Sequence, residues 1–252
     1  MFSELFKRNC FFLLNVSDSL TQEKKEFLKN NMVTCIEEYR KRSEEKESPT
    51  NFLTMTCDKE ATWIIGNEEA GVDVNEIDYD WSNFKFNGEG NISGALEKCT
   101  NFIKKHLKQF TFMKPTVILI TDGTCDDKET TDKAIEDFKA IFSRNGKDKV
   151  ICVVVKIGEV ENELLEKFAI KGTKCHESHI EENVPFIFDL DEEDLWEELA
   201  NLQAFFSCDS FRIYDCGNNN SEAVFIGDDH RCAEDDDVIV IINDTTNNWD
   251  DL

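Results

Sequence analysis

Short apolar runs alternate along the chain with longer segments in which apolar residues recur near helical spacing. Cys10–Val16, Pro115–Thr121 and Lys149–Ile157 are short and predominantly apolar, as expected of strands buried on both faces of a sheet. After the first of them, Leu20–Ser43 carries apolar residues at helical spacing with charged residues between. This segment predicts a helix packed on the sheet, and Thr21 can cap its start.

The remaining elements follow in the same alternating order. Asn51–Cys57 and Ala61–Ile65 flank a polar turn and predict a hairpin. Val184–Phe188 predicts a further strand that follows a polar loop. Asn67–Glu89 has no helical period and predicts a long loop. Further helices are predicted at Ile92–Phe110, Asp126–Arg144, Glu159–Ala169 and Glu192–Phe206.

The alternation of six strands with about five helices predicts an α/β fold with a doubly wound, mostly parallel six-stranded sheet flanked by helices. We expect this domain to span residues 8–208. Beyond it, short β-branched or aromatic runs are separated by Gly, Asn and Asp. Residues 209–252 therefore predict a small, acidic, antiparallel β appendage, with strands at Phe211–Tyr214, Ala223–Ile226 and Val238–Ile242.

Oxygen-bearing side chains follow two of the predicted strands. Asn15-Val16-Ser17-Asp18-Ser19 ends the first strand, and Thr121-Asp122-Gly123 ends the strand that starts at Pro115. The carboxyl ends of neighbouring parallel strands open onto one crevice, so hydroxyls from the first segment and a carboxylate from the second can converge there. Oxygen ligands of this kind suit a hard cation. The pattern therefore predicts a candidate metal site at this end of the sheet.

The order N-x-S-x-S, then a Gly-rich helix entry at Gly88–Leu96, then T-D-G resembles the von Willebrand factor type A (VWA) domain and its metal-ion-dependent adhesion site (MIDAS). The family's motif is D-x-S-x-S, a later Thr and a later Asp. The resemblance implies a Rossmann-like VWA fold and a Mg²⁺ site. The positions that match the family's ligands are Asn15, Ser17, Ser19, Gly90 and Asp122.

A narrower resemblance is to bacterial proteins of the TerY-like kind. It rests on the same two motifs together with Phe188-Asp189-Leu190 and the later pair Phe205-Phe206.

Two departures from the family's motif weaken the implied metal site. Asn15 stands where the family has Asp, and Gly90 stands where it has Thr. Divalent hard cations prefer charged oxygen ligands, and this version offers one firmly placed carboxylate, that of Asp122. The resemblance thus implies a degenerate site. Four nearby residues carry oxygen or amide groups that can substitute as ligands: Asp18, Glu89, Asn91 and Ser93.

Each candidate ligand also has a local structural alternative. Ser17 and Ser19 precede an apolar helical segment, where Ser commonly caps the helix. Asp122 precedes Gly123, so its carboxylate can instead stabilise a turn. From the sequence alone both alternatives stay open.

The charge of the chain limits its partners. The formal net charge of −25 repels phosphate backbones, which excludes nucleic acid and anionic membranes as expected partners. It favours a cation or a protein with a basic surface. The hydrophobic fraction of 40% and the twenty Phe residues supply a core, so disorder is not expected.

The location expected from the sequence is cytoplasmic. The first residues lack the pattern of a signal peptide, and no window is apolar enough for a membrane span. The ten Cys residues are scattered singly, and several lie inside apolar runs, where we expect small core residues with reduced thiols.

The function that these features favour is a non-enzymatic protein-interaction module of the VWA type. Its crevice is expected to receive a partner, either through an acidic side chain that completes the coordination of Mg²⁺ or through a basic surface drawn to the acidic exterior. The chain lacks common enzyme motifs such as a P-loop or a G-x-S-x-G elbow. Two alternatives stay open: a metal-dependent, phosphatase-like hydrolase that uses Asp18 or Asp126 to activate water, and a structural subunit with a vestigial site.

Overall fold

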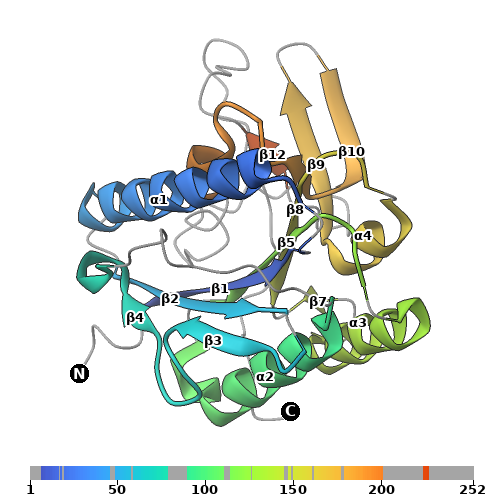
Figure 1. Cartoon of the computed structure of the whole chain (residues 1–252), viewed down its shortest axis with the longest axis horizontal. Helices are drawn as coiled ribbons and strands as arrows, with labels where there is room; N and C mark the ends of the chain where they lie inside the picture. The colour runs from blue at the N-terminus through green and yellow to red at the C-terminus, as the bar shows by residue number, and fades with distance from the viewer. Residues whose placement is uncertain are drawn as a thin grey trace, which may run out of the picture.

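A central sheet lies between two layers of helices (Figure 1). The computed structural model describes residues 7–16, 18, 20–45, 49–57, 59–78, 90–110, 114–125, 127–144, 147–148, 150–160, 162–176, 179–200 and 224–226 of the 252-residue chain. Within them, seven strands form the sheet in the order β11-β8-β5-β1-β2-β3, with β4 also paired to β2. Their bounds are β1 (Arg8–Asn15), β2 (Thr50–Thr56), β3 (Thr62–Ile65), β4 (Val72–Asp73), β5 (Thr116–Thr121), β8 (Ile151–Lys156) and β11 (Ile187–Asp189).

The strand order reverses between β1 and β5. Strands β11, β8, β5, β1 and β2 are parallel, whereas β3 and β4 run antiparallel to β2. The chain moves from β1 to β2 in one direction and from β5 to β8 in the other. Right-handed crossovers therefore place the intervening helices on opposite faces. Figure 1 shows α1 (Gln22–Glu45) on one face, and α2 (Ile92–Lys105) with α3 (Lys128–Phe142) on the other.

The core is built on β1, whose eight residues are all buried. Because side chains alternate along a strand, neighbouring Phe residues of β1 face opposite helical layers. Phe12 packs against Phe52 and Tyr39, with ring centroids 4.7 and 6.3 Å away, on the side of α1. Phe11 meets Phe102 of α2 at 5.4 Å on the other side. The strand thereby joins both halves of the core.

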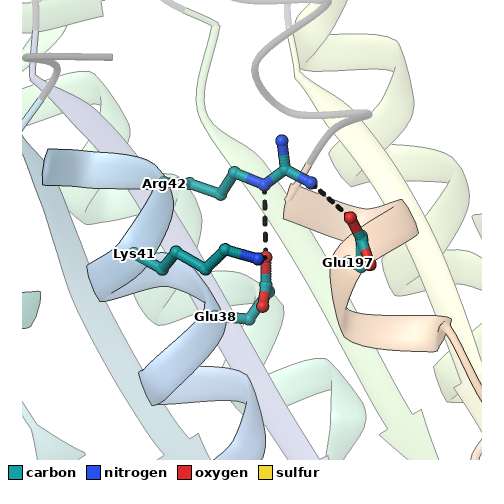
Figure 2. Close-up of polar contacts among 4 residues, drawn as sticks. All are labelled: Glu38, Lys41, Arg42 and Glu197. Atoms are coloured by element: carbon teal, nitrogen blue, oxygen red, sulfur yellow. Dashed lines mark hydrogen bonds and ion pairs between the residues drawn. The ribbon is translucent and has the colours of Figure 1, made fainter. Parts of the chain in front are cut away.

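Residues 195–200 are helical and pack on α1. The indole Nε1 of Trp196 donates to Asn31 Oδ1 at 2.9 Å. Figure 2 shows the polar contact beside it, in which Arg42 bridges Glu38 of its own helix at 3.2 Å and Glu197 at 2.6 Å. The guanidinium side chain is only 11% exposed, so the bridge is screened less than a surface ion pair. These contacts hold the end of the described domain against α1.

The predicted fold class is confirmed, and all six predicted strands are present. Four of the predicted helices form with somewhat different ends: α4 spans Asn162–Phe168, and α2 is followed by the 3₁₀ turn η4 (Leu107–Phe110). Of the helix predicted at Glu192–Phe206, residues 195–200 are helical and residues 201–206 lie outside the described residues. Within the predicted loop Asn67–Glu89, the structure has β4 and the 3₁₀ turn η2 (Val74–Glu76), and residues 79–89 lie outside the described residues. The Cys residues at 10, 35, 57, 99 and 152 are buried, as expected of core positions.

One prediction about the second half of the chain is wrong. The polar loop before Val184 is a hairpin of β9 (Lys171–His176) and β10 (His179–Pro185), which backbone pairing forms without an apolar period. The strand predicted at Ala223–Ile226 forms as β12 (Val224–Ile226), which pairs in parallel with β9. The other strands predicted for the appendage lie outside the described residues. A short hairpin of β6 (Ser143–Arg144) and β7 (Lys147–Asp148) follows α3.

No helix in the described part of the chain is long and apolar enough to cross a membrane.

Val153→Asp tests the central position of β8. Val153 is fully buried, so the substitution places an unpaired charge between the helical layers and should cost about 3–5 kcal/mol or more. We expect little soluble protein. Val33→Asp is the matched control, because Val33 is 43% exposed on α1 and should change stability by no more than about 1 kcal/mol. Equal soluble yields and equal urea midpoints for the two variants would contradict the assigned position.

Candidate functional site

A row of polar side chains crosses the sheet where its parallel strands end, an end that we call the carboxyl edge. Asn15 pairs in register with Thr121, Thr121 with Lys156, and Lys156 with Asp189. In-register residues of adjacent strands point to the same face of a sheet. Asn15 and Thr121 are buried, whereas the Lys156 ammonium forms an ion pair with Asp189 Oδ1 at 3.0 Å and is partly exposed. This edge row spans the point between β1 and β5 where the strand order reverses, at which open α/β sheets bind ligands.

The amide of Asn15 fastens the end of β1 to the loop that follows β5. Its Nδ2 donates to Thr121 Oγ1 at 2.9 Å and to the backbone carbonyl of Thr124 at 2.5 Å. A carbonyl only accepts hydrogen bonds, so the amide group is oriented with nitrogen toward Thr124. The other atom of the amide, Oδ1, must therefore point away from Thr124.

Asn15 Oδ1 has no hydrogen-bond partner within the described structure, although the residue is fully buried. A buried acceptor without a partner costs about 1–3 kcal/mol. Such an atom is uncommon in a native protein and marks a place where a donor or a cation would be stabilised. It is the feature of the carboxyl edge that most directly indicates a ligand.

The loop Thr121–Thr124 has a fixed conformation. The Asp122 backbone N–H donates to the Asn15 carbonyl at 3.2 Å, and Asp122 Oδ1 accepts from the Thr124 N–H at 3.1 Å and its hydroxyl at 2.7 Å. Gly123 has φ +84°, and a Cβ there would lie 2.4 Å from Val160 Cγ1, so only glycine fits. The turn-forming role foreseen for Asp122 is thus present, and its backbone N–H joins this turn to Asn15.

Gly90 lies at the carboxyl edge through the end of β2. The backbone N–H groups of Gly90 and Asn91 both donate to the Cys57 carbonyl, while the Cys57 N–H donates to the Leu14 carbonyl. Gly90 has φ +86°. It has no side chain to offer a ligand, and its N–H already has a partner.

Asn91 and Ser93, foreseen as substitute ligands, take part in starting α2. Asn91 Oδ1 accepts from the Gly94 N–H at 2.8 Å and from the Ser93 hydroxyl at 3.1 Å. Asn91 Nδ2 donates to the Lys59 carbonyl at 2.9 Å. Both side chains therefore serve as a helix cap. A Cβ at Gly94 would lie within 3 Å of the Asn91 side chain, which explains the glycine.

Charged side chains lie on the segments that follow these strands. The Lys25 ammonium donates to the Asp18 carbonyl at 3.0 Å and lies 3.6 Å from its carboxylate. Lys24 Nζ lies 3.0 Å from the position that a Cβ on Gly158 would take, in the loop after β8. At the start of α3, hydrogen bonds from the Thr130 hydroxyl and backbone hold the pKa of Asp127 below its ordinary value.

The Asp122 N–H donates to the Asn15 carbonyl, and Gly90 lies one strand away at the end of β2. Ser17 and Ser19 lie outside the described residues, so their role as ligands stays a prediction. Thr21 caps α1 as predicted, accepting from the Lys24 N–H at 3.3 Å. Two features of the edge were not predicted from the sequence, namely the contact with Thr124 and the Lys156–Asp189 ion pair. A lysine directly after the apolar run Ile151–Val155 was the available signal.

The donor set fits a hard cation in kind, although its charge is low. The Asn15 Oδ1 oxygen and the Asp122 carboxylate are ligands of the type that Mg²⁺ accepts. They carry one negative charge together, and Gly90 adds no side-chain ligand. No group of three or more His, Cys, Asp or Glu residues that could hold a metal occurs in the described ranges. Any divalent cation here is expected to bind weakly.

Comparison with known proteins supports the fold. No family model matches the sequence, and no curated protein matches it. Among solved structures, proximal thread matrix protein 1 from the mussel byssus matches with a TM-score of 0.51 and 14% identity, covering 78% of this chain and 46% of that one. A structure of the same protein with a zinc-occupied MIDAS motif matches with a TM-score of 0.48 and 14% identity, covering 78% of this chain and 45% of that one. The SpRpn10 VWA domain matches with a TM-score of 0.44 and 10% identity, covering 65% of this chain and 80% of that one.

The first of these likenesses shows the fold and no more, because the identity is low. The chain has the mixed α/β, Rossmann-like fold of VWA domains, and it spans about half the length of the mussel protein. The degenerate MIDAS and the TerY-like subtype stay predictions.

Asn15→Asp restores the family's residue but should destabilise this protein. The exchange removes the donor that reaches the Thr124 carbonyl and places a carboxylate against it, which we expect to cost about 1–3 kcal/mol at neutral pH. Urea unfolding measures the loss, and Asn30→Asp, at an exposed position of α1, is the control for the added charge. Unchanged stability together with tenfold tighter Mg²⁺ binding would mean that Asn15 is oriented otherwise.

Gly90→Thr restores the second departure and should also destabilise the fold. A β-branched residue at φ +86° is strained by about 1–3 kcal/mol. Gly90→Asn is the control, since Asn tolerates positive φ better than other residues. Thermal unfolding of the two variants compares them. If Thr proves no worse than Asn, the strain argument fails.

Proposed function

We propose that this chain is a non-enzymatic protein-interaction module of the VWA type that binds its partner at the carboxyl edge of the sheet. The observation that carries the proposal is the buried, unpartnered Oδ1 of Asn15, next to the Asp122 loop at the reversal of strand order. The fold supports it, because open α/β sheets bind ligands at this position.

A weak Mg²⁺ site is part of the proposal. The residues that would hold the ion are Asn15 and Asp122, together with Ser17 and Ser19 as predicted from the sequence. A bound Mg²⁺ would add positive charge to the edge and could accept an oxygen of a partner's acidic side chain as a ligand. Since the described ligands carry one negative charge, occupancy is expected only at high metal concentration.

The hydrolase alternative receives no comparable support. Asp18, one of the two carboxylates considered for activating water, lies beside Lys25 and is mostly exposed. Asp126, the other candidate, lies outside the described residues.

Asp122→Ala tests the site. The variant loses the hydrogen bonds that Thr124 donates to the carboxylate within one loop, and we expect it to cost about 1–2 kcal/mol, far less than Val153→Asp. Binding should suffer more than folding. Calorimetric titration with Mg²⁺ and Mn²⁺, and affinity capture of partners with and without EDTA, compare the wild type, Asp122→Ala and the control Asp137→Ala, whose side chain is exposed on α3.

The expected result is a partner that the wild type and Asp137→Ala retain and Asp122→Ala loses. A heat of metal binding confined to millimolar concentrations would agree with the low ligand charge. Absence of any heat would remove Mg²⁺ from the proposal and leave the edge as the binding site. Equal capture by all three proteins would refute the site itself.

A further inference from the structure

We propose that Thr121 is a positioning residue of the carboxyl edge, whose buried hydroxyl orients the Asn15 amide so that Oδ1 is the atom left for a ligand. This role rests on the proposed function, and it names the residue through which Asn15 acts. Thr121 itself contacts no ligand in this proposal. Its effect on binding passes through the amide of Asn15.

The Thr121 hydroxyl accepts hydrogen bonds from two different segments. Asn15 Nδ2, at the end of β1, donates to Thr121 Oγ1 at 2.9 Å. The Gly123 N–H, in the turn after β5, donates to the same oxygen at 2.9 Å. A hydroxyl oxygen has two lone pairs, so these two donors occupy both. One side-chain atom therefore joins β1 to the turn that follows β5.

Burial and the backbone hold this oxygen in place. Thr121 is 1% exposed, and its carbonyl accepts from the Ile157 N–H, just beyond β8, at 2.8 Å. A branched side chain such as that of threonine has few χ1 rotamers available. Solvent is poorly placed to replace a buried hydroxyl, so its removal leaves both of its donors without a partner.

The Asn15 amide depends on Thr121 for its orientation. An amide NH₂ group has two protons, and here the acceptors are Thr121 Oγ1 and the Thr124 carbonyl. A half-turn of the amide would break both bonds, whereas without the Thr121 hydroxyl only the bond to Thr124 opposes a tilt. If the orientation that presents Oδ1 is populated for a smaller fraction of the time, the apparent affinity falls by that fraction.

Thr116, at the start of the same strand, provides a matched control. It is also 1% exposed, but its Oγ1 has no hydrogen-bond partner within the described residues. Exchange of Thr for Val keeps the branched shape and removes the hydroxyl. At Thr116 the exchange removes an unpartnered oxygen and should leave the urea midpoint unchanged or raise it. At Thr121 it strands two donors and should lower the midpoint.

The experiment is nuclear magnetic resonance on the ¹⁵N-labelled full chain, read at the two side-chain protons of Asn15 and the N–H of Gly123. In Thr121→Val we expect upfield shifts of the Gly123 proton and of the Asn15 proton that loses the hydroxyl. The Asn15 proton that faces the Thr124 carbonyl should keep its shift. A general loss of packing would not single out one proton of the pair.

Two further variants complete the comparison. Thr121→Ser keeps the hydroxyl and should restore both signals, whereas Thr116→Val should leave all three at their wild-type positions. In the capture experiment described for the proposed function, Thr121→Val should hold the retained partner about fivefold less tightly, the factor that corresponds to one lost hydrogen bond. Thr121→Ser and Thr116→Val should hold it as the wild type does.

The wild type decides the question if Thr121→Val does not fold. Both Asn15 side-chain protons and the Gly123 N–H should then exchange slowly with water, and fast exchange of the Gly123 proton or of either Asn15 proton would overturn the role of Thr121.

The remaining outcomes separate this role from the proposed function. Unchanged signals in Thr121→Val, or changed signals without any loss of the partner, would overturn the role of Thr121 and leave the proposed function standing. Equal capture by Asp122→Ala and the wild type would refute the site, and the role of Thr121 would be refuted with it.

Discussion

The parallel pairing of β1 with both β2 and β5 is the constraint on which the rest of the structure depends. It buries all of β1 and sends Phe11 and Phe12 into opposite halves of the core. It also fixes the reversal of strand order, which separates the loops after β1 and β5. The position of the carboxyl edge at this reversal follows from the topology rather than from any particular ligand. The residues that line it then decide its chemistry.

The sequence predicts well which strands are buried and in which order strands and helices follow one another. The runs before Asn15 and Asp122 can only be buried strands, and parallel pairing then brings those two residues together. The β9–β10 hairpin was missed because backbone ladders stabilise it, and such ladders leave no period in the side chains. The pairing of Lys156 with Asp189 requires the register between two strands, which composition does not encode.

The orientation of the Asn15 amide could not be predicted from the sequence either. It is set by the carbonyl of Thr124, a backbone atom 109 residues away, whose position depends on the turn at Gly123. Sequence comparison with the family can identify Asn15 as a weakened ligand. Only the hydrogen bonds show that its nitrogen has a structural task and that its oxygen is the atom left for a ligand.

The two departures from the family's metal motif are each accompanied by contacts. Asn15 gains the bond to Thr124, which Asp could not make when ionised, and Gly90 adopts a positive φ while donating to the Cys57 carbonyl. A site that had merely lost its function would be expected to lose residues without such compensation. Here Asn15 and Gly90, the two residues that differ from the family's motif, form contacts that hold the ends of β1, β2 and β5 together. Restoring either residue alone therefore disturbs the edge before it can supply a metal ligand.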